Sequence, residues 1–364
     1  MRVVILLPGY SASPVGGYSV VYQYANYLCS LPDIQVVIVH DGFRLVNTIR
    51  PTPRRILSLI KGSLSFHLGK IGVRKFKPWA RWDPRIEVEN SIRSLDDLRL
   101  GTNDLVLATA VETALTAELI AKTRGCAGWY FLQHVETWNY GREYLDNTIR
   151  SSLRKIAVAP WIRDYCADLG EPCEVVLNAV DGESFPLGSF GPRRKLVSTL
   201  LSPGIPLKRT DIAIDVLNGL VGLGYPAAAF GAKPRPRSLD SRVVYKRLPD
   251  RLTLLDLYQR SRVFFCVSQT EGFGLTPAEA TLAGAAIVST NNGGVEAYAE
   301  SFGRFTGEPD VGRTIAAVVD LMRNPEEARS RAERGREQLM SYTPENASKE
   351  FARILLEADP PKAQ

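Results

Sequence analysis

Short apolar runs rich in β-branched residues recur along this chain, and segments with helical periodicity separate them. Such alternation predicts an α/β fold with a parallel sheet between helices, because parallel strands need a long and usually helical crossover connection. The expected strands lie at residues 3–7, 36–40, 105–109, 130–133, 155–158, 174–177, 195–201, 227–230, 243–245, 263–267 and 286–289.

A stretch rich in Gly, Pro and Ser, residues 178–194, divides these strands into two series. With 364 residues the chain is long enough for two domains, each with its own core. We therefore expect two doubly wound, Rossmann-like domains, residues 1–185 and 186–340. A ligand cleft is expected between the carboxyl ends of their strands.

Composition excludes several classes of protein. Hydrophobic residues at 45% and charged residues at 23% are typical of a globular chain. No apolar run approaches the length of a membrane-spanning helix, and the run before Pro8 predicts a buried strand instead of a signal sequence. The five scattered cysteines predict reduced thiols in a cytoplasmic protein, and three histidines disfavour a His-rich metal site.

Positive charge is concentrated in one segment, residues 42–82, which has ten Lys or Arg and no acid. Apolar residues recur there at helical spacing from Leu57 to Ile71. Two interpretations stay open: a helix lying on an anionic membrane surface, or a helix docked on its own domain with a solvated basic face. Nucleic-acid binding is disfavoured because no recognised module accompanies the charge.

A Gly-rich turn follows one expected strand and leads into a helix that opens with Thr276-Pro277. Proline suits the first helical turn, where its missing N–H would have no partner anyway. Gly272 and Gly274 lack side chains, so backbone N–H groups at the helix start can approach an anion. Glu271 and Glu279 flank this turn. The pattern fits a cradle for a sugar joined to a diphosphate.

The same residues also have an ordinary structural interpretation. Thr276 and Glu279 have the spacing of a capping box, in which Glu279 bonds only the backbone at the helix start. Glu271 could be a loop carboxylate without a ligand.

The string from Glu271 to Ala280, E-G-F-G-L-T-P-A-E-A, resembles the signature of retaining glycosyltransferases of family 4. That signature has two glutamates separated by seven residues. The resemblance extends over nearly the whole chain. It implies a GT-B fold and transfer of a sugar from a nucleotide diphosphate donor to a hydroxyl acceptor, without a metal or another cofactor.

The resemblance also implies roles for individual residues. Glu279 is expected to hold the nucleoside's sugar hydroxyls. Glu271 is expected to hold the donor sugar's hydroxyls or the positive charge that develops on that sugar. Phe273 is placed beside the donor sugar, and the amides of Gly274 and Leu275 are placed at the diphosphate.

Gly16 and Gly17 lie in the turn after the first expected strand, with a helix expected near Tyr18. Alone, such a pair indicates a tight turn. The order from Ser13 to Leu28 resembles the glycine loop of the family's acceptor domain, which lies beside the donor diphosphate. No G-x-G-x-x-G motif follows the strand, so a dinucleotide-dependent dehydrogenase is disfavoured.

Lys208 and Arg209 form a basic pair at the start of an expected helix, where the helix dipole prefers acids. A phosphate site would tolerate that conflict, although a solvated basic turn is the simpler alternative. Lys208 matches a family lysine, and Arg209 stands where the family has glycine. Leu248 is assigned to the nucleoside, but Arg247 replaces another family glycine and leaves the base open.

His134 follows an expected strand, and a histidine in this position is commonly satisfied by the backbone. The string Q-H-V-E-T-W, residues 133–138, resembles a subset of the family assigned to rhamnose transfer in bacterial surface polysaccharides. His134 is therefore carried forward as catalytic, and Glu136 as a further candidate without an assigned role. The resemblance also implies that the last helix, within residues 341–364, crosses back to the first domain.

Taken together, these features predict a retaining glycosyltransferase, with dTDP-rhamnose as the lead donor and a glycan or lipid-linked hydroxyl acceptor. The protein is expected in the cytoplasm, free or on the inner face of the membrane. One alternative is a nucleotide-sugar hydrolase, epimerase or phosphorylase. Another is a non-catalytic subunit that binds a sugar nucleotide or glycan.

Overall fold

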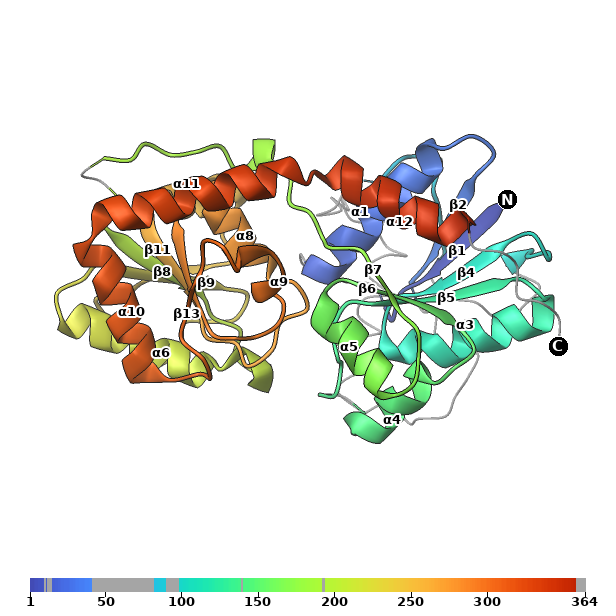
Figure 1. The fold of residues 1–364 in the computed structure, drawn as a ribbon, viewed down its shortest axis with the longest axis horizontal. Coiled ribbons are helices and arrows are strands. Elements are labelled where there is room, and N and C mark those ends of the chain that lie inside the picture. The colour runs from blue at the N-terminus through green and yellow to red at the C-terminus, as the bar shows by residue number, and fades with distance from the viewer. Residues whose placement is uncertain are drawn as a thin grey trace, which may run out of the picture. The chain divides into compact units, whose positions relative to one another are not determined.

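A computed structural model describes residues 1–9, 11, 15–40, 82–89, 98–138, 140–191 and 194–357. The basic segment 42–82 lies outside these residues apart from Trp82, so neither interpretation of it is tested. The chain divides into two compact units (Figure 1): Met1–Asn178 with Glu345–Gln364, and Ala179–Pro344. These boundaries differ by a few residues from those expected near 185 and 340. Each unit is described by itself.

The first unit is built on a seven-stranded parallel sheet in the order β3-β2-β1-β4-β5-β6-β7. Its strands are β1 (Arg2–Leu6), β2 (Gln35–Val39), β3 (Glu87–Glu89), β4 (Leu105–Ala108), β5 (Ala127–Leu132), β6 (Arg154–Ala157) and β7 (Glu174–Val175). The central strands are buried on both faces, which explains why they consist of continuous apolar runs.

Within the described residues, four helices connect these strands: α1 (Gly16–Ser30), α3 (Val111–Arg124), α4 (Gly141–Ile149) and α5 (Pro160–Asp168). From β1 the chain moves outward through α1 to β2, whereas from β4 it moves the other way through α3, α4 and α5. Right-handed crossovers therefore put α1 on one face of the sheet and α3, α4 and α5 on the other (Figure 1). The direction reverses between β1 and β4.

The last helix, α12 (Pro344–Glu357), packs on this first unit beside α1 (Figure 1). Phe351 is fully buried and stacks on Tyr24, with ring centroids 4.2 Å apart, and meets Phe131 edge to face at 5.2 Å. The side-chain amide of Gln23 donates to the hydroxyl of Ser348 over 3.3 Å. These contacts attach the C-terminal helix to α1 and β5, which lie far earlier in the chain.

The second unit has a six-stranded sheet in the order β10-β9-β8-β11-β12-β13, again with parallel pairs. Its strands are β8 (Leu196–Leu200), β9 (Ala227–Gly231), β10 (Val244–Arg247), β11 (Ser261–Cys266), β12 (Ala286–Ser289) and β13 (Arg304–Phe305). The chain direction reverses between β8 and β11, so that point is this unit's topological switch.

The helices of the second unit cover both faces of its sheet (Figure 1). They are α6 (Thr210–Gly222), α7 (Arg251–Arg260), α8 (Leu275–Leu282), α9 (Glu296–Ala299), α10 (Val311–Arg323) and α11 (Pro325–Ser341), with short 3₁₀ turns η2 (Gly182–Ser184) and η3 (Pro206–Lys208). α10 packs on α6, whereas α11 and α7 pack on α8. Apolar residues of α6 and α10 join the β8 and β11 side chains in one core.

The predicted fold class is confirmed, and every expected strand is present with shifts of up to three residues. The sequence did not reveal β3 and β13, which are short edge strands without a buried apolar run. The five cysteines are free, as expected, and four of them are buried. Among the described helices, none combines the length and apolar character that crossing a bilayer requires.

Replacing Phe351 by Ala should lower the stability of the first unit by about 3–5 kcal/mol, because a buried aromatic ring is lost and leaves a cavity. Denaturant unfolding followed by tryptophan fluorescence measures this directly, since all five tryptophans belong to that unit. The exposed control Arg353→Ala should change stability by less than about 0.5 kcal/mol. Equal effects of the two substitutions would contradict the packing of α12.

Candidate active site

Three loops of the second unit converge at the carboxyl edge of its sheet. They follow β8, β11 and β12, and each ends at a helix start. The backbone N–H of Gln269 donates to the carbonyl of Leu207 over 2.7 Å, and that of Glu271 donates to Asn292 over 3.0 Å. The loop after β11 is thus tied to the loops on both sides. This is the position at which open α/β sheets bind ligands.

Glu271 lies at the centre of the three loops with 8% of its surface exposed. One carboxylate oxygen accepts from the hydroxyl of Ser268 over 2.7 Å, and the other accepts from Lys208 Nζ over 2.5 Å. The thiol of Cys266 lies 3.8 Å from the first oxygen, and burial beside this carboxylate raises the thiol's pKa to about 11. Glu271 is therefore a fixed, buried anion with a cation beside it.

Lys208 reaches Glu271 from η3, in the loop after β8. Burial alone would lower the pKa of Lys208, but the Glu271 carboxylate outweighs burial and the pKa is raised. The side chain keeps about a quarter of its surface exposed. Lys208 is consequently a permanent cation that a second anion can still approach.

The start of α8 lies directly after Glu271 and lacks a side-chain cap. Its N-cap is Gly274, whose φ of 89° is in the left-handed region that favours glycine. An added Cβ there would also lie 2.7 Å from a methyl group of Val295. In the described part of the chain, the amides of Leu275 and Thr276 donate to no acceptor. They form an open anion seat beside Glu271 and Lys208.

The side chain of Phe273 lies inside the second unit. Its ring is buried and packs on Tyr298, with centroids 4.6 Å apart. The Tyr298 hydroxyl donates to the Gly274 carbonyl over 2.9 Å. This ring fixes the turn from inside the domain, and the expected position of Phe273 beside the donor sugar stays a prediction.

The capping-box interpretation of Glu279 is wrong. The helix begins one residue before Thr276, and Glu279 lies in the second turn. Its carboxylate accepts a hydrogen bond from the Tyr258 hydroxyl of α7 over 2.9 Å. Burial raises the pKa of Glu279 to about 7, although the hydrogen bond from Tyr258 and the charge of Arg251 oppose this shift.

Arg209 and Leu248 both adopt left-handed backbone conformations, with φ of 43° and 45°. The guanidinium of Arg209 makes two bonds to the Asp211 carboxylate, at 2.8 and 3.1 Å, so the structure pairs it with the first turn of α6. This pair lies between partly exposed side chains, and the expected role of Arg209 at the diphosphate stays a prediction. Leu248 follows β10 at the carboxyl edge of the sheet and is 50% exposed, which leaves its side chain available to a ligand.

Gly16 and Gly17 belong to the first unit and are the first two residues of α1, which begins two residues before the expected start near Tyr18. A Cβ on Gly17 would lie 3.0 Å from the side-chain oxygen of Gln133. Gly17 therefore permits close packing of α1 against the end of β5. Val15, the N-cap residue, provides no side-chain hydrogen bond.

His134 follows β5 at the carboxyl edge of the first sheet. Its ring lies between Trp138 and Trp161, with centroids 5.0 and 5.5 Å away, and Nδ1 lies 3.1 Å from the carbonyl oxygen of Val135. The neighbouring Glu136 accepts from the first backbone amide of α3, that of Val111, over 2.8 Å. Glu136 thus caps the start of α3. This structural role accounts for a carboxylate at this position without any bound ligand.

Several residues that hold Glu271, Glu279 and the turn between them were not predicted from the sequence. They are Tyr258, Ser268, Asn292, Gly294 and Tyr298. A Cβ on Gly294 would lie 2.6 Å from the carbonyl oxygen of Glu271, so only glycine allows this approach of the two loops. The Asn-Asn-Gly-Gly turn after β12 was the signal that could have revealed two of them.

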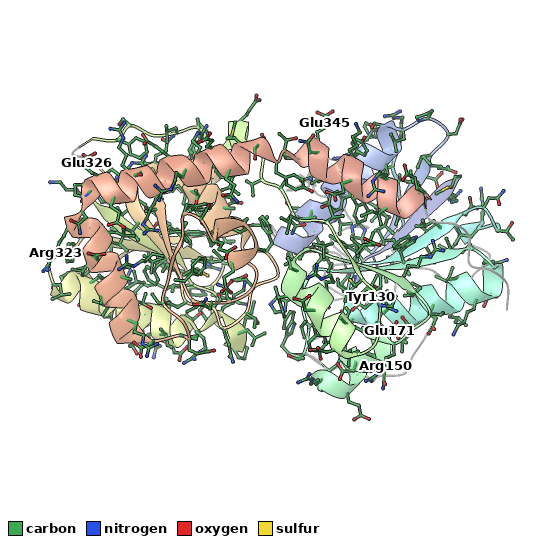
Figure 2. The ribbon with its side chains drawn as sticks, viewed as in Figure 1. Tyr130, Arg150, Glu171, Arg323, Glu326 and Glu345 are labelled. Atoms are coloured by element: carbon green, nitrogen blue, oxygen red, sulfur yellow. The ribbon has the colours of Figure 1, made fainter. Side chains whose placement is uncertain are left out.

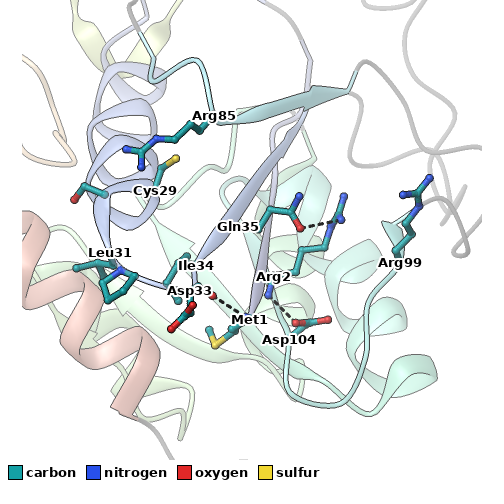
Figure 3. Close-up of a pocket in the computed structure, with 12 residues that line it drawn as sticks. Met1, Arg2, Cys29, Leu31, Asp33, Ile34, Gln35, Arg85, Arg99 and Asp104 are labelled. Carbon is teal, nitrogen blue, oxygen red and sulfur yellow. Dashed lines mark hydrogen bonds between the residues drawn. The ribbon is translucent and has the colours of Figure 1, made fainter.

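A cavity of about 840 Å³ in the first unit lies at the amino edge of the sheet, beside Arg2, Gln35 and Asp104 (Figure 3). These groups bond one another or the backbone: Arg2 Nη1 donates to Gln35, and the backbone amide of Arg2 donates to Asp104. The cavity is wide and open, and these contacts use several of its polar groups. It does not include any residue singled out in the sequence.

Known proteins resemble this chain in part of its sequence and in its fold. Residues 240–338 match the family model described as Glycosyl transferases group 1. The chain has a GT-B glycosyltransferase fold. The matched residues include Glu271 and Glu279 but not Lys208. No curated protein matches the chain in sequence.

Three solved structures illustrate the likeness in fold. Anabaena Alr3699/HepE in complex with UDP-glucose is 14% identical, with a TM-score of 0.72, covering 98% of this chain and 100% of that one. Sucrose-phosphate synthase from Thermosynechococcus elongatus is 12% identical, with a TM-score of 0.72 and coverages of 97% and 98%. S. aureus TarM, as a variant in complex with Fondaparinux, alpha-GlcNAc-glycerol and UDP, is 11% identical, with a TM-score of 0.71 and coverages of 98% and 100%.

The raised pKa of Glu279 predicts a pH dependence that Glu279→Gln should remove. A carboxyl with a folded pKa near 7 instead of 4.5 takes up a proton on folding, so its stabilisation is full below pH 4.5 and is lost as the pH rises to about 7. The glutamine keeps a side-chain oxygen that accepts the hydrogen bond from Tyr258, but it has no carboxyl group to ionise. The melting temperature of the variant, relative to the native protein, should therefore rise between about pH 5 and pH 8. If the melting temperatures of the variant and the native protein changed in parallel with pH, the pKa of Glu279 would not be raised in the folded protein.

Proposed function

We propose that the chain is a retaining glycosyltransferase that moves a sugar from a nucleotide diphosphate donor to a hydroxyl acceptor. The observation that carries this proposal is the ion pair of Lys208 and Glu271 at the topological switch of the second unit, beside the open start of α8. A cation, free amides and a buried carboxylate in one place suit a ligand with a diphosphate at one end and hydroxyls at the other.

Charge on the leaving diphosphate must be neutralised for the glycosidic bond to break. Lys208 and the amides of Leu275 and Thr276 supply positive charge and hydrogen-bond donors for this. They are preorganised, because the surrounding loops are held by backbone bonds and by buried side chains. This arrangement supports a reaction that needs no metal.

The two glutamates have different roles in the proposal. Glu271, ionised beside Lys208, accepts hydrogen bonds from the donor sugar's hydroxyls and stabilises the positive charge that develops on that sugar. Glu279, held by Tyr258, accepts from the hydroxyls of the nucleoside's sugar. Leu248 offers an exposed apolar side chain to the base. Attack from the face that the leaving group vacates gives retention without a protein nucleophile.

The proposed donor and acceptor rest on residues 133–138, on a neighbouring structure and on the first unit. Residues 133–138 support dTDP-rhamnose as the lead donor, whereas the UDP-glucose bound by Anabaena HepE makes that nucleotide sugar the second choice. His134 and its two tryptophans form the candidate acceptor surface of the first unit. A hydroxyl of a glycan or a lipid-linked sugar is the proposed acceptor.

Lys208→Ala should weaken the binding of free UDP and dTDP by about tenfold or more, because charge-assisted bonds to the diphosphate are lost. Isothermal titration calorimetry measures this without any acceptor. Lys122→Ala removes an exposed lysine from α3 in the first unit and should leave the affinity unchanged. Unchanged affinity in Lys208→Ala would move the diphosphate site elsewhere.

Glu271→Gln separates binding from transfer. The variant keeps the shape of the side chain, so nucleotide binding should persist while sugar transfer to an acceptor extract falls by about a hundredfold or more. Donor consumed at the full rate without an acceptor would favour the hydrolase alternative. Tight donor binding with no turnover at all would favour a non-catalytic subunit.

A further inference from the structure

A small cavity lies at the amino edge of the second sheet, opposite the edge that carries Glu271 and Lys208. It has a volume of about 240 Å³ and is lined by residues that precede β8 and β12, by β11 and by the start of α11. Figure 2 labels Arg323 at the end of α10 and Glu326 at the start of α11, which locate this corner of the unit. The volume is below that of a site for a drug-sized ligand, so it suits one small group.

Three arginines line the cavity: Arg194, Arg262 and Arg329. Glu326 is the only acid among the described lining residues, and it is exposed. The guanidinium groups of Arg329 and Arg194 both lie over the ring of Phe190, at 5.2 and 4.8 Å from its centroid. The cavity therefore has an excess of positive charge around an aromatic ring.

Arg194 is buried, with 4% of its surface exposed, and no carboxylate pairs with it in the described residues. Its guanidinium donates only to backbone carbonyls: those of Ser189 at 3.4 Å, Ser261 at 3.1 Å and Ala283 at 3.0 Å. A guanidinium carries more N–H groups than these three, so donors remain for a ligand. Burial lowers the pKa of Arg194 to about 10, as expected for a cation without a counterion.

The other two arginines are also only partly used. Arg262 donates from Nη1 to the carbonyl of Met322 over 2.7 Å, and Arg329 donates from Nε to Glu333 over 2.8 Å, between two half-exposed side chains. Each keeps further N–H groups. Planar guanidinium groups bind the oxygens of a phosphate in pairs, and the start of α11 adds the positive end of a helix dipole.

We infer that this cavity is a second anion site that takes a phosphate group, bound by Arg194, Arg262 and Arg329 and independent of the nucleotide cradle. The phosphate would supply the counterion that Arg194 lacks. It would also join the amino ends of β8 and β11 to α11. The shared chemistry is that of inorganic phosphate and of the phosphate of a small sugar phosphate.

Inorganic phosphate is the first probe, and it is titrated into Lys208→Ala so that the nucleotide cradle contributes little. Calorimetry and thermal shift should both detect millimolar binding. Adding Arg262→Gln and Arg329→Gln to that background should weaken phosphate binding by about tenfold or more. Both side chains reach the surface, so the fold should be retained; Arg194, which bonds three backbone carbonyls, is left intact.

The matched control replaces Arg242 and Arg260 by Gln. These arginines are exposed, belong to the same unit, and each pairs with a nearby aspartate, so the control removes the same charge outside the cavity. It should bind phosphate like the parent. Equal loss in both double variants, or phosphate binding to the native protein that Lys208→Ala abolishes, would overturn the inference.

A second titration uses glucose 1-phosphate in the same variants and identifies the source of the group. If the sugar phosphate binds more tightly than inorganic phosphate, and loses that affinity in Arg262→Gln with Arg329→Gln, the ligand is a phosphorylated metabolite. If inorganic phosphate binds as tightly, the site recognises the free ion. Absence of binding by both probes to all proteins would contradict the site.

Discussion

The ion pair between Lys208 and Glu271 is the contact on which the candidate active site depends. Bringing a carboxylate and an ammonium group out of water is costly, and the cost is offset only when the partners are close and further hydrogen bonds satisfy them. Here Ser268 supplies such a bond, and the loop after β12 holds Glu271 through its backbone amide and through the close approach of Gly294. The pair therefore exists because three strand ends meet at one place in the sheet.

The two edges of the second sheet carry different chemistry. At the carboxyl edge the loops end in glycines and free amides, and a cation and a carboxylate lie together. At the amino edge three arginines surround a small cavity with little opposing acid. Because the strands are parallel, all their carboxyl ends lie at one edge of the sheet and all their amino ends at the other. The length of the strands therefore separates the two sites. A protein of this architecture can thus hold two anions independently.

Much of the fold was predictable because buried parallel strands are continuous apolar runs, and such runs stand out in a sequence. The turn from Glu271 to Glu279 was predictable for a similar reason, since glycines, a proline and two acids at fixed spacing occur within a single loop. The prediction of an anion seat beside Glu271 rested on these local features.

What escaped prediction depends on contacts between distant parts of the chain. Tyr258 lies 21 residues from Glu279, and its hydroxyl rather than the helix start binds that carboxylate. The packing of the Phe273 ring on Tyr298 joins residues 25 positions apart, and the motif alone did not reveal it. Arg209 stands where a glycine was expected, and its positive φ shows that the backbone there has the shape a glycine would favour.

The central claim is that the cradle of Lys208, Glu271 and the α8 start binds a nucleotide diphosphate. A crystal structure of the native protein grown with UDP or dTDP tests it most directly. The account predicts both phosphates within hydrogen-bonding distance of Lys208 Nζ and of the amides of Leu275 and Thr276. A nucleotide bound with its phosphates away from these groups, while Lys208 and Glu271 stay paired and uncontacted, would contradict it.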